Sequence, residues 1–309
     1  MEHREIPSES VTPELPTRTW RLVLAALGKL PQGALSRLTG RLADLPLPRP
    51  TRPLVLSAFA RAFGIDVSEA ERPLAEYGSI DAFFVRRLRD GVRTWPRDAH
   101  LATSPVDGFV GRVGRVTRGR ALQAKGRDYS VAELLGDNLE GERYEGGIFV
   151  TLYLSPRHYH RVHTPMAGEI RRARHLPGAL LPVNAAAVVH VADLFVQNER
   201  LLCYVQGGFG EVAVIAVGAY NVGRISAAFD AHWGTPGAGA VTNRPGAEVE
   251  TRDYVPGIMV APGAELMTFH LGSTVVLLFE PERLVLGAAV VPGAELRVGQ
   301  ELGRANVAR

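Results

Sequence analysis

The chain has 309 residues, of which 46% are hydrophobic, and its formal net charge is only +3. These values predict a soluble globular protein with a sizeable core. The single cysteine, Cys203, excludes an internal disulfide and favours a reducing compartment. Residues 1–17 are polar and contain four acids, so no signal peptide is expected, and they are predicted to be disordered. The apolar run 22–27 is too short to cross a bilayer.

The positive charge is concentrated near the N-terminus. Between Arg18 and Arg61 there are eight basic residues and one acid, Asp44. Apolar residues recur at helical spacing over 20–30 and 35–45, which predicts two amphipathic helices. Their apolar faces either pack against the rest of the protein or lie on an anionic membrane surface. Nucleic acid fits less well, because the segment lacks interleaved aromatic residues and the rest of the chain is not basic.

Two more helices are expected in the N-terminal third. The proline-rich segment 46–53 interrupts the helical pattern. A helix is expected over 54–63, with Gly64 as its C-terminal cap. The segment Ser-Glu-Ala-Glu at 68–71 is typical of a capping box, and residues 79–88 are expected to form another helix.

After Pro96 the sequence changes to short valine-rich runs separated by glycines, which predicts a β-rich body. One short helix is expected at 130–135. The expected strands lie near residues 109–116, 147–154, 169–173, 187–195, 201–205, 211–219 and 274–279. The predicted fold is α+β: a β-rich catalytic body of short, largely antiparallel strands with hammerhead-like hairpins (96–309), preceded by a membrane-associating region of N-terminal amphipathic helices (18–95).

Three histidines, His158, His160 and His163, lie within the segment LYLSPRHYHRVHTP. Imidazole is a common zinc ligand, so this cluster raises a metal-dependent hydrolase as one hypothesis. No nearby cysteine or pair of carboxylates completes a ligand set, and in an extended chain His163 points away from the other two. Histidines without a metal are the simpler interpretation.

Asp107 and Ser273 are further candidates. Asp107 lies in a Ser-Pro-Val-Asp-Gly segment, and an Asp-Gly pair by itself indicates only a turn. Ser273 follows Gly272 at the entry of an apolar run, where a glycine weakens a strand. The Gly-x-Ser-x-Gly elbow of α/β-hydrolases is absent, since Val275 stands two residues after the serine.

The Gly272–Ser273 bond has a chemistry of its own. Glycine has no Cβ, so its carbonyl is open to attack by the neighbouring hydroxyl. If a histidine removes the hydroxyl proton, the amide shifts to an ester. β-Elimination then leaves a dehydroalanine, which hydrolyses to an N-terminal pyruvoyl group. The chain would be cut into residues 1–272 and 273–309, and the serine would become a carbonyl cofactor.

Seven segments of the chain form a distinctive series. They are SIDAFFVRRLRDGVR (79–93), SPVDG (104–108), AKGRDYSVAELLG (124–136), GGIFVTLYLSPRHYHRVHTP (146–165), LFVQNERLLC (194–203), VGAYNVGRI (217–225) and FHLGSTVVLLFEP (269–281). In this order they resemble bacterial phosphatidylserine decarboxylase, a family whose Leu-Gly-Ser-Thr motif undergoes this self-cleavage. The combination of Asp-Gly, Tyr-His-Arg-Val-His and Leu-Gly-Ser-Thr is highly specific, whereas the first 78 residues show little match.

The resemblance implies roles for individual residues. Asp107, His163 and Ser273 match the Asp-His-Ser charge relay of self-cleavage, with His163 as the general base. Ser273 is the nucleophile and becomes the pyruvoyl group that forms a Schiff base with the substrate. His160 matches a second histidine, an acid or base of the decarboxylation. His158 stands where relatives carry an acid, so no essential role is expected for it.

The implied cofactor is the pyruvoyl group derived from Ser273, with neither pyridoxal phosphate nor a metal. Pyridoxal phosphate needs a lysine, and the chain has only Lys29 and Lys125, the first of them in the basic N-terminal segment. The implied substrate is phosphatidylserine in an anionic membrane, which is converted to phosphatidylethanolamine and CO2. The implied protein is peripheral on the cytoplasmic side of the cell membrane, an alpha/beta heterodimer of its cleaved fragments that forms a homodimer, with no nucleic-acid partner.

Two alternatives stay open. One is a metal-dependent hydrolase that uses His158, His160 and His163. The other is a non-enzymatic β-rich binding module in which Ser273 is only a turn residue. Metal analysis and the masses of the expressed fragments distinguish these alternatives from a self-cleaving decarboxylase.

Overall fold

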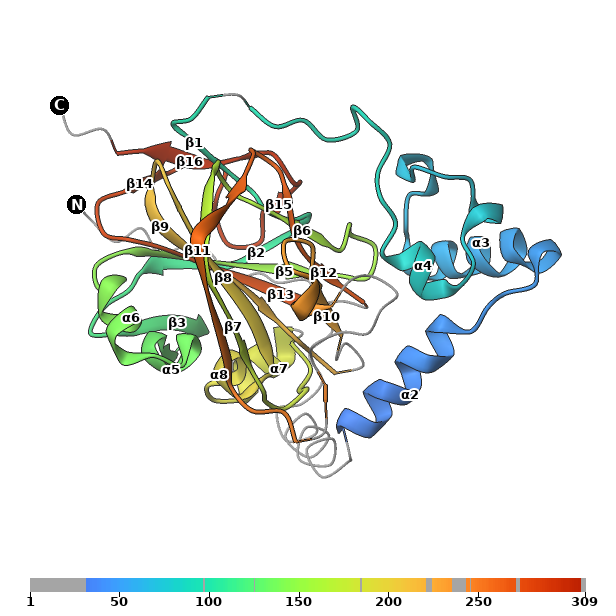
Figure 1. The fold of residues 1–309 in the computed structure, drawn as a ribbon, viewed down its shortest axis with the longest axis horizontal. Coiled ribbons are helices and arrows are strands. Elements are labelled where there is room, and N and C mark those ends of the chain that lie inside the picture. Colours follow the sequence, from blue (N-terminus) through green and yellow to red (C-terminus); the bar gives the residue numbers. More distant parts are fainter. Residues whose placement is uncertain are drawn as a thin grey trace.

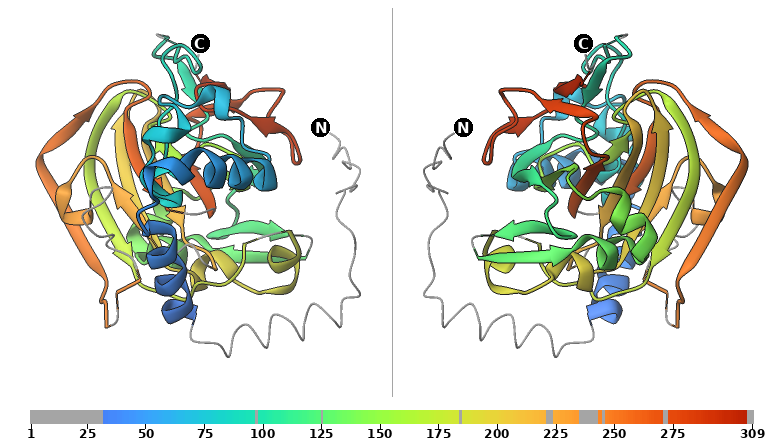
Figure 2. Two further views of the ribbon diagram at one scale, coloured as in Figure 1. Left: turned by 90° about the vertical axis from the view of Figure 1, so that its right-hand side faces the viewer. Right: turned by 90° about the vertical axis from the view of Figure 1, so that its left-hand side faces the viewer.

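The computed structural model describes residues 32–96, 98–124, 126–183, 185–220, 224–234, 243–244, 246–270 and 273–306. A β-rich body forms most of the molecule, and helices α2, α3 and α4 lie on one side of it (Figures 1 and 2). The helices are α2 (Gln32–Asp44), α3 (Arg52–Phe63), α4 (Ile80–Phe84), α5 (Val131–Leu135), α6 (Asn138–Arg143), α7 (Ala185–His190) and α8 (Leu194–Gln197), with 3-10 turns η1 (Arg49–Thr51), η2 (Val67–Glu69), η3 (Leu74–Glu76) and η4 (Ala231–Trp233). The strands are β1 (Leu101–Thr103), β2 (Gly108–Arg115), β3 (Arg120–Ala124), β4 (Arg127–Ser130), β5 (Ile148–Leu154), β6 (Arg161–His163), β7 (Gly168–Leu176), β8 (Arg200–Gly207), β9 (Gly210–Val217), β10 (Ile225–Ala227), β11 (Glu250–Val260), β12 (Glu265–Phe269), β13 (Ser273–Phe279), β14 (Leu284–Leu286), β15 (Glu295–Leu296) and β16 (Glu301–Ala305).

The body is built on an eight-stranded antiparallel sheet in the order β11-β7-β8-β9-β13-β5-β2-β15. Its strand β13 pairs along its length with β9 on one side and β5 on the other. Successive side chains of a strand point to opposite faces, so Val275, Leu277 and Phe279 enter one core. Val276 and Leu278 enter the core on the other face. A strand buried on both faces requires the continuous apolar run that the sequence shows.

Smaller elements cover the two faces of this sheet. On the face of Leu277, the three-stranded sheet β10-β12-β6 contributes Ile225, Leu266 and Phe269 to the core. On the opposite face, the β3–β4 pair and helices α5, α7 and α8 contribute residues such as Tyr129. Cys203 is fully buried in β8, and burial raises the pKa of its thiol, so this side chain packs as part of the core.

The N-terminal helices have a small core of their own. Leu56 of α3 packs there with Tyr77 and with Phe83 of α4. Helix α3 ends at Gly64, whose φ of 70° lies in the left-handed region that favours glycine. Leu38 and Leu42 of α2, and Leu45 directly after it, are more than half exposed. Within the described part of the chain, no helix is both long and apolar enough to cross a membrane.

Most expected elements are confirmed, including helix 54–63 with its Gly64 cap, but the strand expected over 187–195 is wrong. Helices α7 and α8 occupy this stretch, and Ala187 and Phe195 pack into the core from them. A short apolar run has the same periodic signal in a buried helix and in a buried strand, which explains the error. Helix α6 was not predicted.

Helix boundaries near the N-terminus also differ from the prediction. The capping box expected at 68–71 is replaced by turn η2, where the carboxylate of Asp66 accepts a hydrogen bond from the Ser68 N–H. The helix expected over 79–88 ends at Phe84, because the chain turns so that the Val85 carbonyl accepts from Arg161. The predictions for residues 1–17, for helix 20–30 and for Lys29, Lys125 and Gly272 lie outside the described residues.

Candidate active site

The serine that begins β13 lies at the entry of the buried sheet. The backbone of Ser273 is paired with Leu154 of β5, and the next residue is paired with β5 and β9 together. The described chain on the other side of the gap ends at His270, which follows the last residue of β12. The segment of sequence that contains the Gly272–Ser273 bond therefore connects β12 and β13, which belong to different sheets.

His160 lies beside this junction, in the loop between β5 and β6. Its carbonyl accepts a hydrogen bond from Phe269 N–H at 3.0 Å. Its fully buried ring lies against Phe84, with 4.1 Å between the ring centroids. Nδ1 lies 2.8 Å from the carbonyl oxygen of His158, which only accepts, so Nδ1 carries the proton. Nε2 has no hydrogen-bond partner among the described residues.

The surroundings of His160 keep its ring neutral. Burial, together with the positive charge of Arg86, lowers the pKa of His160 to about 3. The ring is therefore neutral at neutral pH, with the proton on Nδ1 and a lone pair on Nε2. A buried polar atom without a partner is uncommon in a folded protein, and here it belongs to a residue that is hydrogen-bonded to Phe269, just before the predicted cleavage segment.

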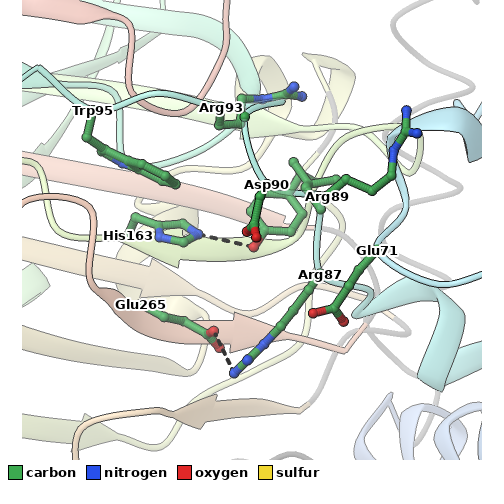
Figure 3. A pocket seen from close by; sticks show the side chains of 11 residues that line it. Glu71, Arg87, Arg89, Asp90, Arg93, Trp95, His163 and Glu265 are labelled. Atoms are coloured by element: carbon green, nitrogen blue, oxygen red, sulfur yellow. Dashed lines mark hydrogen bonds and ion pairs between the residues drawn. The ribbon is translucent and has the colours of Figure 1, made fainter.

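His163, the last residue of β6, lines a cleft of about 360 Å³ together with Trp95, Tyr159 and Glu265 (Figure 3). Its Nδ1 donates to the carbonyl of Gly263 at 2.7 Å. Its Nε2 lies 3.2 Å from the hydroxyl of Tyr159. Burial lowers the pKa of His163, so the neutral ring accepts a hydrogen bond from the Tyr159 hydroxyl at Nε2. Both ring nitrogens of this predicted base are occupied.

The turn that carries Asp107 lies next to His163, whose N–H donates to the Pro105 carbonyl at 2.8 Å. The Asp107 carboxylate accepts hydrogen bonds from Arg93 Nε at 3.1 Å and Nη2 at 2.5 Å. It also accepts from the Val298 N–H at 2.8 Å. The structure thus brings Asp107 and His163 into one region, but each of them is bonded to other groups.

Arg93 is a residue of this site that sequence reasoning missed. Arg93 lines the cleft, and its guanidinium binds Glu69 as well as Asp107, with both Arg93–Glu69 hydrogen bonds at 3.0 Å. Burial opposes the charge of Arg93, but its hydrogen bonds to Asp107 and Glu69 raise its pKa. The arginine lies in the first of the seven segments, yet nothing in its local pattern shows its two acidic partners.

His158 belongs to a separate set of contacts. Its Nδ1 accepts from the Ser155 N–H at 3.0 Å, and its Nε2 lies 3.1 Å from Glu295. The rings of the three histidines therefore have different hydrogen-bond partners. Among the described residues, no group of three or more His, Cys, Asp and Glu side chains is arranged to hold a metal ion.

The described part of this region thus holds a serine at the entry of a core strand and two buried histidines with lowered pKa values. Comparison with known proteins identifies the family. The family model described as phosphatidylserine decarboxylase matches residues 80–304. The chain belongs to this family.

Similar proteins come from several bacteria. The chain is 45% identical over 285 residues to a phosphatidylserine decarboxylase proenzyme of Anaeromyxobacter sp. (strain K), covering 92% of this chain and 99% of the relative. A protein of the same name from Myxococcus xanthus is 40% identical, covering 89% of this chain and 95% of the relative. A third, from Azotobacter vinelandii, is 41% identical, covering 93% and 99%.

Proposed function

We propose that this chain is the precursor of a phosphatidylserine decarboxylase, a carboxy-lyase that converts phosphatidylserine to phosphatidylethanolamine and CO2. Membership of the family supports this activity, and the relatives carry the proenzyme name. One observation carries the proposal. Ser273 begins the buried strand β13, and His160 is hydrogen-bonded to Phe269, four residues earlier in the chain, while its neutral ring has an Nε2 with no partner among the described residues. These features are consistent with a serine that is converted to a pyruvoyl group within the chain.

Self-cleavage at Gly272–Ser273 produces the cofactor. The Ser273 oxygen adds to the Gly272 carbonyl and the C–N bond breaks, which gives an ester and a free amino group. Elimination releases the Gly272 carboxylate and leaves dehydroalanine. Water then replaces the nitrogen, which leaves as ammonia, and a pyruvoyl group remains at position 273. When formed, this group supplies the electron sink for decarboxylation.

The relay of Asp107, His163 and Ser273 is assigned to self-cleavage. In the described arrangement, His163 is bonded to Gly263 and Tyr159, and Asp107 to Arg93. Formation of the relay therefore requires His163 to exchange both of its ring contacts. His160 already has the tautomer of a base and is assigned to proton transfer during decarboxylation.

The N-terminal region is assigned to an anionic membrane surface on the cytoplasmic side. Helix α2 presents its exposed leucines on one face, and Arg41 is exposed beside them. Apolar side chains next to basic ones suit an amphipathic helix that lies on anionic lipid. In this proposal the mature protein consists of fragments 1–272 and 273–309, paired as an alpha/beta unit that forms a homodimer.

Intact-mass measurement of the purified chain tests the proposal. Fragments 1–272 and 273–309 are expected, the smaller one with a pyruvoyl mass, and Ser273→Ala should give one uncut chain. The cut protein should convert phosphatidylserine in vesicles to phosphatidylethanolamine, whereas Ser273→Ala should not. Active wild-type protein that remains uncut would contradict the mechanism.

The two histidines are distinguished by separate measurements. His163→Gln should accumulate uncut precursor. His160→Gln should be cut but should decarboxylate slowly, since acid–base groups contribute about 10²–10⁴-fold. Normal self-cleavage by His163→Gln would remove His163 from the relay.

A further inference from the structure

His270, two residues before Gly272, is held by a buried polar network. Its Nδ1 lies 2.9 Å from Oδ2 of Asp81, in helix α4. Its Nε2 lies 3.2 Å from the hydroxyl oxygen of Ser226, in β10. The three residues are 5%, 7% and 1% exposed, respectively. Because a carboxylate only accepts, Nδ1 carries a proton and donates it to Asp81.

Arg224 completes the network. Its carbonyl accepts from the His270 N–H at 3.0 Å, and its Nη2 lies 3.1 Å from Oδ1 of Asp81. The same guanidinium binds Asp44 of α2. Burial favours the neutral form of Asp81, but the hydrogen bond from His270 and the charge of Arg224 lower its pKa. Asp81 is therefore ionised at neutral pH and accepts from both His270 and Arg224.

The order Ser226, His270, Asp81 is that of a serine hydrolase relay, so a second nucleophile has to be considered. Ser226 is 1% exposed, which prevents a substrate in solution from reaching its hydroxyl. Its contacts are with neighbouring segments of the same chain. The arrangement therefore holds a segment in place.

The segment that it holds leads into the predicted cleavage site. Ser273 is held independently, by its pairing in the large sheet. Attack of Ser273 on the Gly272 carbonyl requires the reacting atoms to lie about 3–3.5 Å apart with the correct alignment. Two residues separate His270 from Ser273, so the placement of His270 limits the positions that the Gly272 carbonyl can take.

We propose that Asp81 and His270 are positioning residues for self-cleavage, through which helix α4 holds the chain that supplies the Gly272 carbonyl. The inference rests on the proposed self-cleavage at Gly272–Ser273. It also assigns a role to the N-terminal helical region in forming the cofactor. The hydrogen bond that carries this role joins Asp81 and His270, which are 189 residues apart in the sequence.

The test follows the cleavage of newly synthesised chain over time by intact mass, with thermal unfolding of the same variants. Asp81→Leu and His270→Leu are each expected to lengthen the half-time about tenfold, because small displacements of reacting atoms have large effects on rate. His270→Asn, which retains a donor toward Asp81, should recover most of the rate.

Glu211→Leu is the matched control. Glu211 is a buried carboxylate of β9 and is 8% exposed. The next residue, Val212, pairs with Phe279, which lies at the opposite end of β13 from Ser273. Glu211 contacts Tyr144 and Arg143. Its loss should lower the melting temperature as Asp81→Leu does, yet leave the cleavage half-time within about twofold of wild type, since no reacting atom is displaced.

The outcomes separate this inference from the proposed function. Cleavage of Asp81→Leu at the wild-type rate, or equal slowing by Glu211→Leu, would overturn the positioning role while self-cleavage stands. If Asp81→Leu does not fold, equal rates for His270→Asn and His270→Leu overturn it. A wild-type chain that is never cut would overturn the proposed function itself.

Discussion

The β body and the N-terminal helices are stabilised in different ways. The body has two large apolar cores on the faces of one sheet. The helices have a small core of their own and join the body through charged and polar contacts. We call these contacts the polar seam: Glu69–Arg93–Asp107, Asp44–Arg224–Asp81, Asp81–His270 and Val85–Arg161. The comparison shows that apolar packing holds the body together, whereas the candidate site lies where polar contacts join it to the helices.

The largest effect on stability is expected from Arg93→Met, which breaks the polar seam. It leaves Asp107 and Glu69 without their buried cation, and breaking such a pair costs about 3–5 kcal/mol of unfolding free energy. Urea unfolding of the variant in an uncut Ser273→Ala background measures this loss of unfolding free energy. Arg143→Met is the control, because Arg143 also contacts carboxylates but is 44% exposed, where an ion pair contributes about 0–1 kcal/mol. Equal losses for both arginines would contradict a special role for the seam.

A change confined to the apolar body is expected to have a slightly smaller effect. Leu277→Ala should lower the unfolding free energy by about 2–5 kcal/mol, because it leaves a cavity in a fully buried strand. Leu139 is 79% exposed, and Leu139→Ala should change the unfolding free energy by less than about 0.5 kcal/mol. A loss below about 1 kcal/mol for Leu277→Ala would mean that β13 is not a core strand.

The buried histidine next to the seam predicts a dependence of stability on pH. The pKa of His160 falls from the model-peptide value of 6.5 to about 3 in the folded chain, so the unfolded chain binds more protons between these values. The stability of the folded chain is complete above pH 6.5 and falls as the pH is lowered, by at most about 1.4 kcal/mol per pH unit for this group. Urea unfolding between pH 7 and pH 4 should show a flatter profile for His160→Gln. An unchanged slope would contradict the neutral buried state.

The smallest effect on stability is expected at the exposed face of α2. Replacing Leu38, Leu42 and Leu45 by serine should change the unfolding free energy by no more than about 0.5 kcal/mol per site. The same variant should bind phosphatidylserine vesicles more weakly in co-sedimentation, because it removes apolar area from the proposed membrane face. Leu139→Ser and Val255→Ser, which change exposed residues elsewhere, should retain binding. Unaltered vesicle binding by the triple variant would contradict the membrane role of α2 and leave it only a structural role.

Much of the fold was predictable because its signals are local. Three of these signals are set by residues close together in the sequence: the apolar run of β13, the short valine-rich runs after Pro96 and the glycine cap at Gly64. The stretch 187–195 was mistaken for a strand, since a short apolar run does not distinguish helix from strand without its tertiary surroundings.

The sequence by itself determined which residue types are available for the chemistry: a Gly-Ser step before a core strand, a cluster of histidines and an Asp-Gly turn. Only the tertiary structure decided their partners. Asp107 is bound by Arg93, fourteen residues away, and His270 by Asp81, 189 residues away. Burial strengthens the effect of these contacts. A charge or an imidazole that is removed from water has its pKa and its stability set by the few groups that the fold places against it.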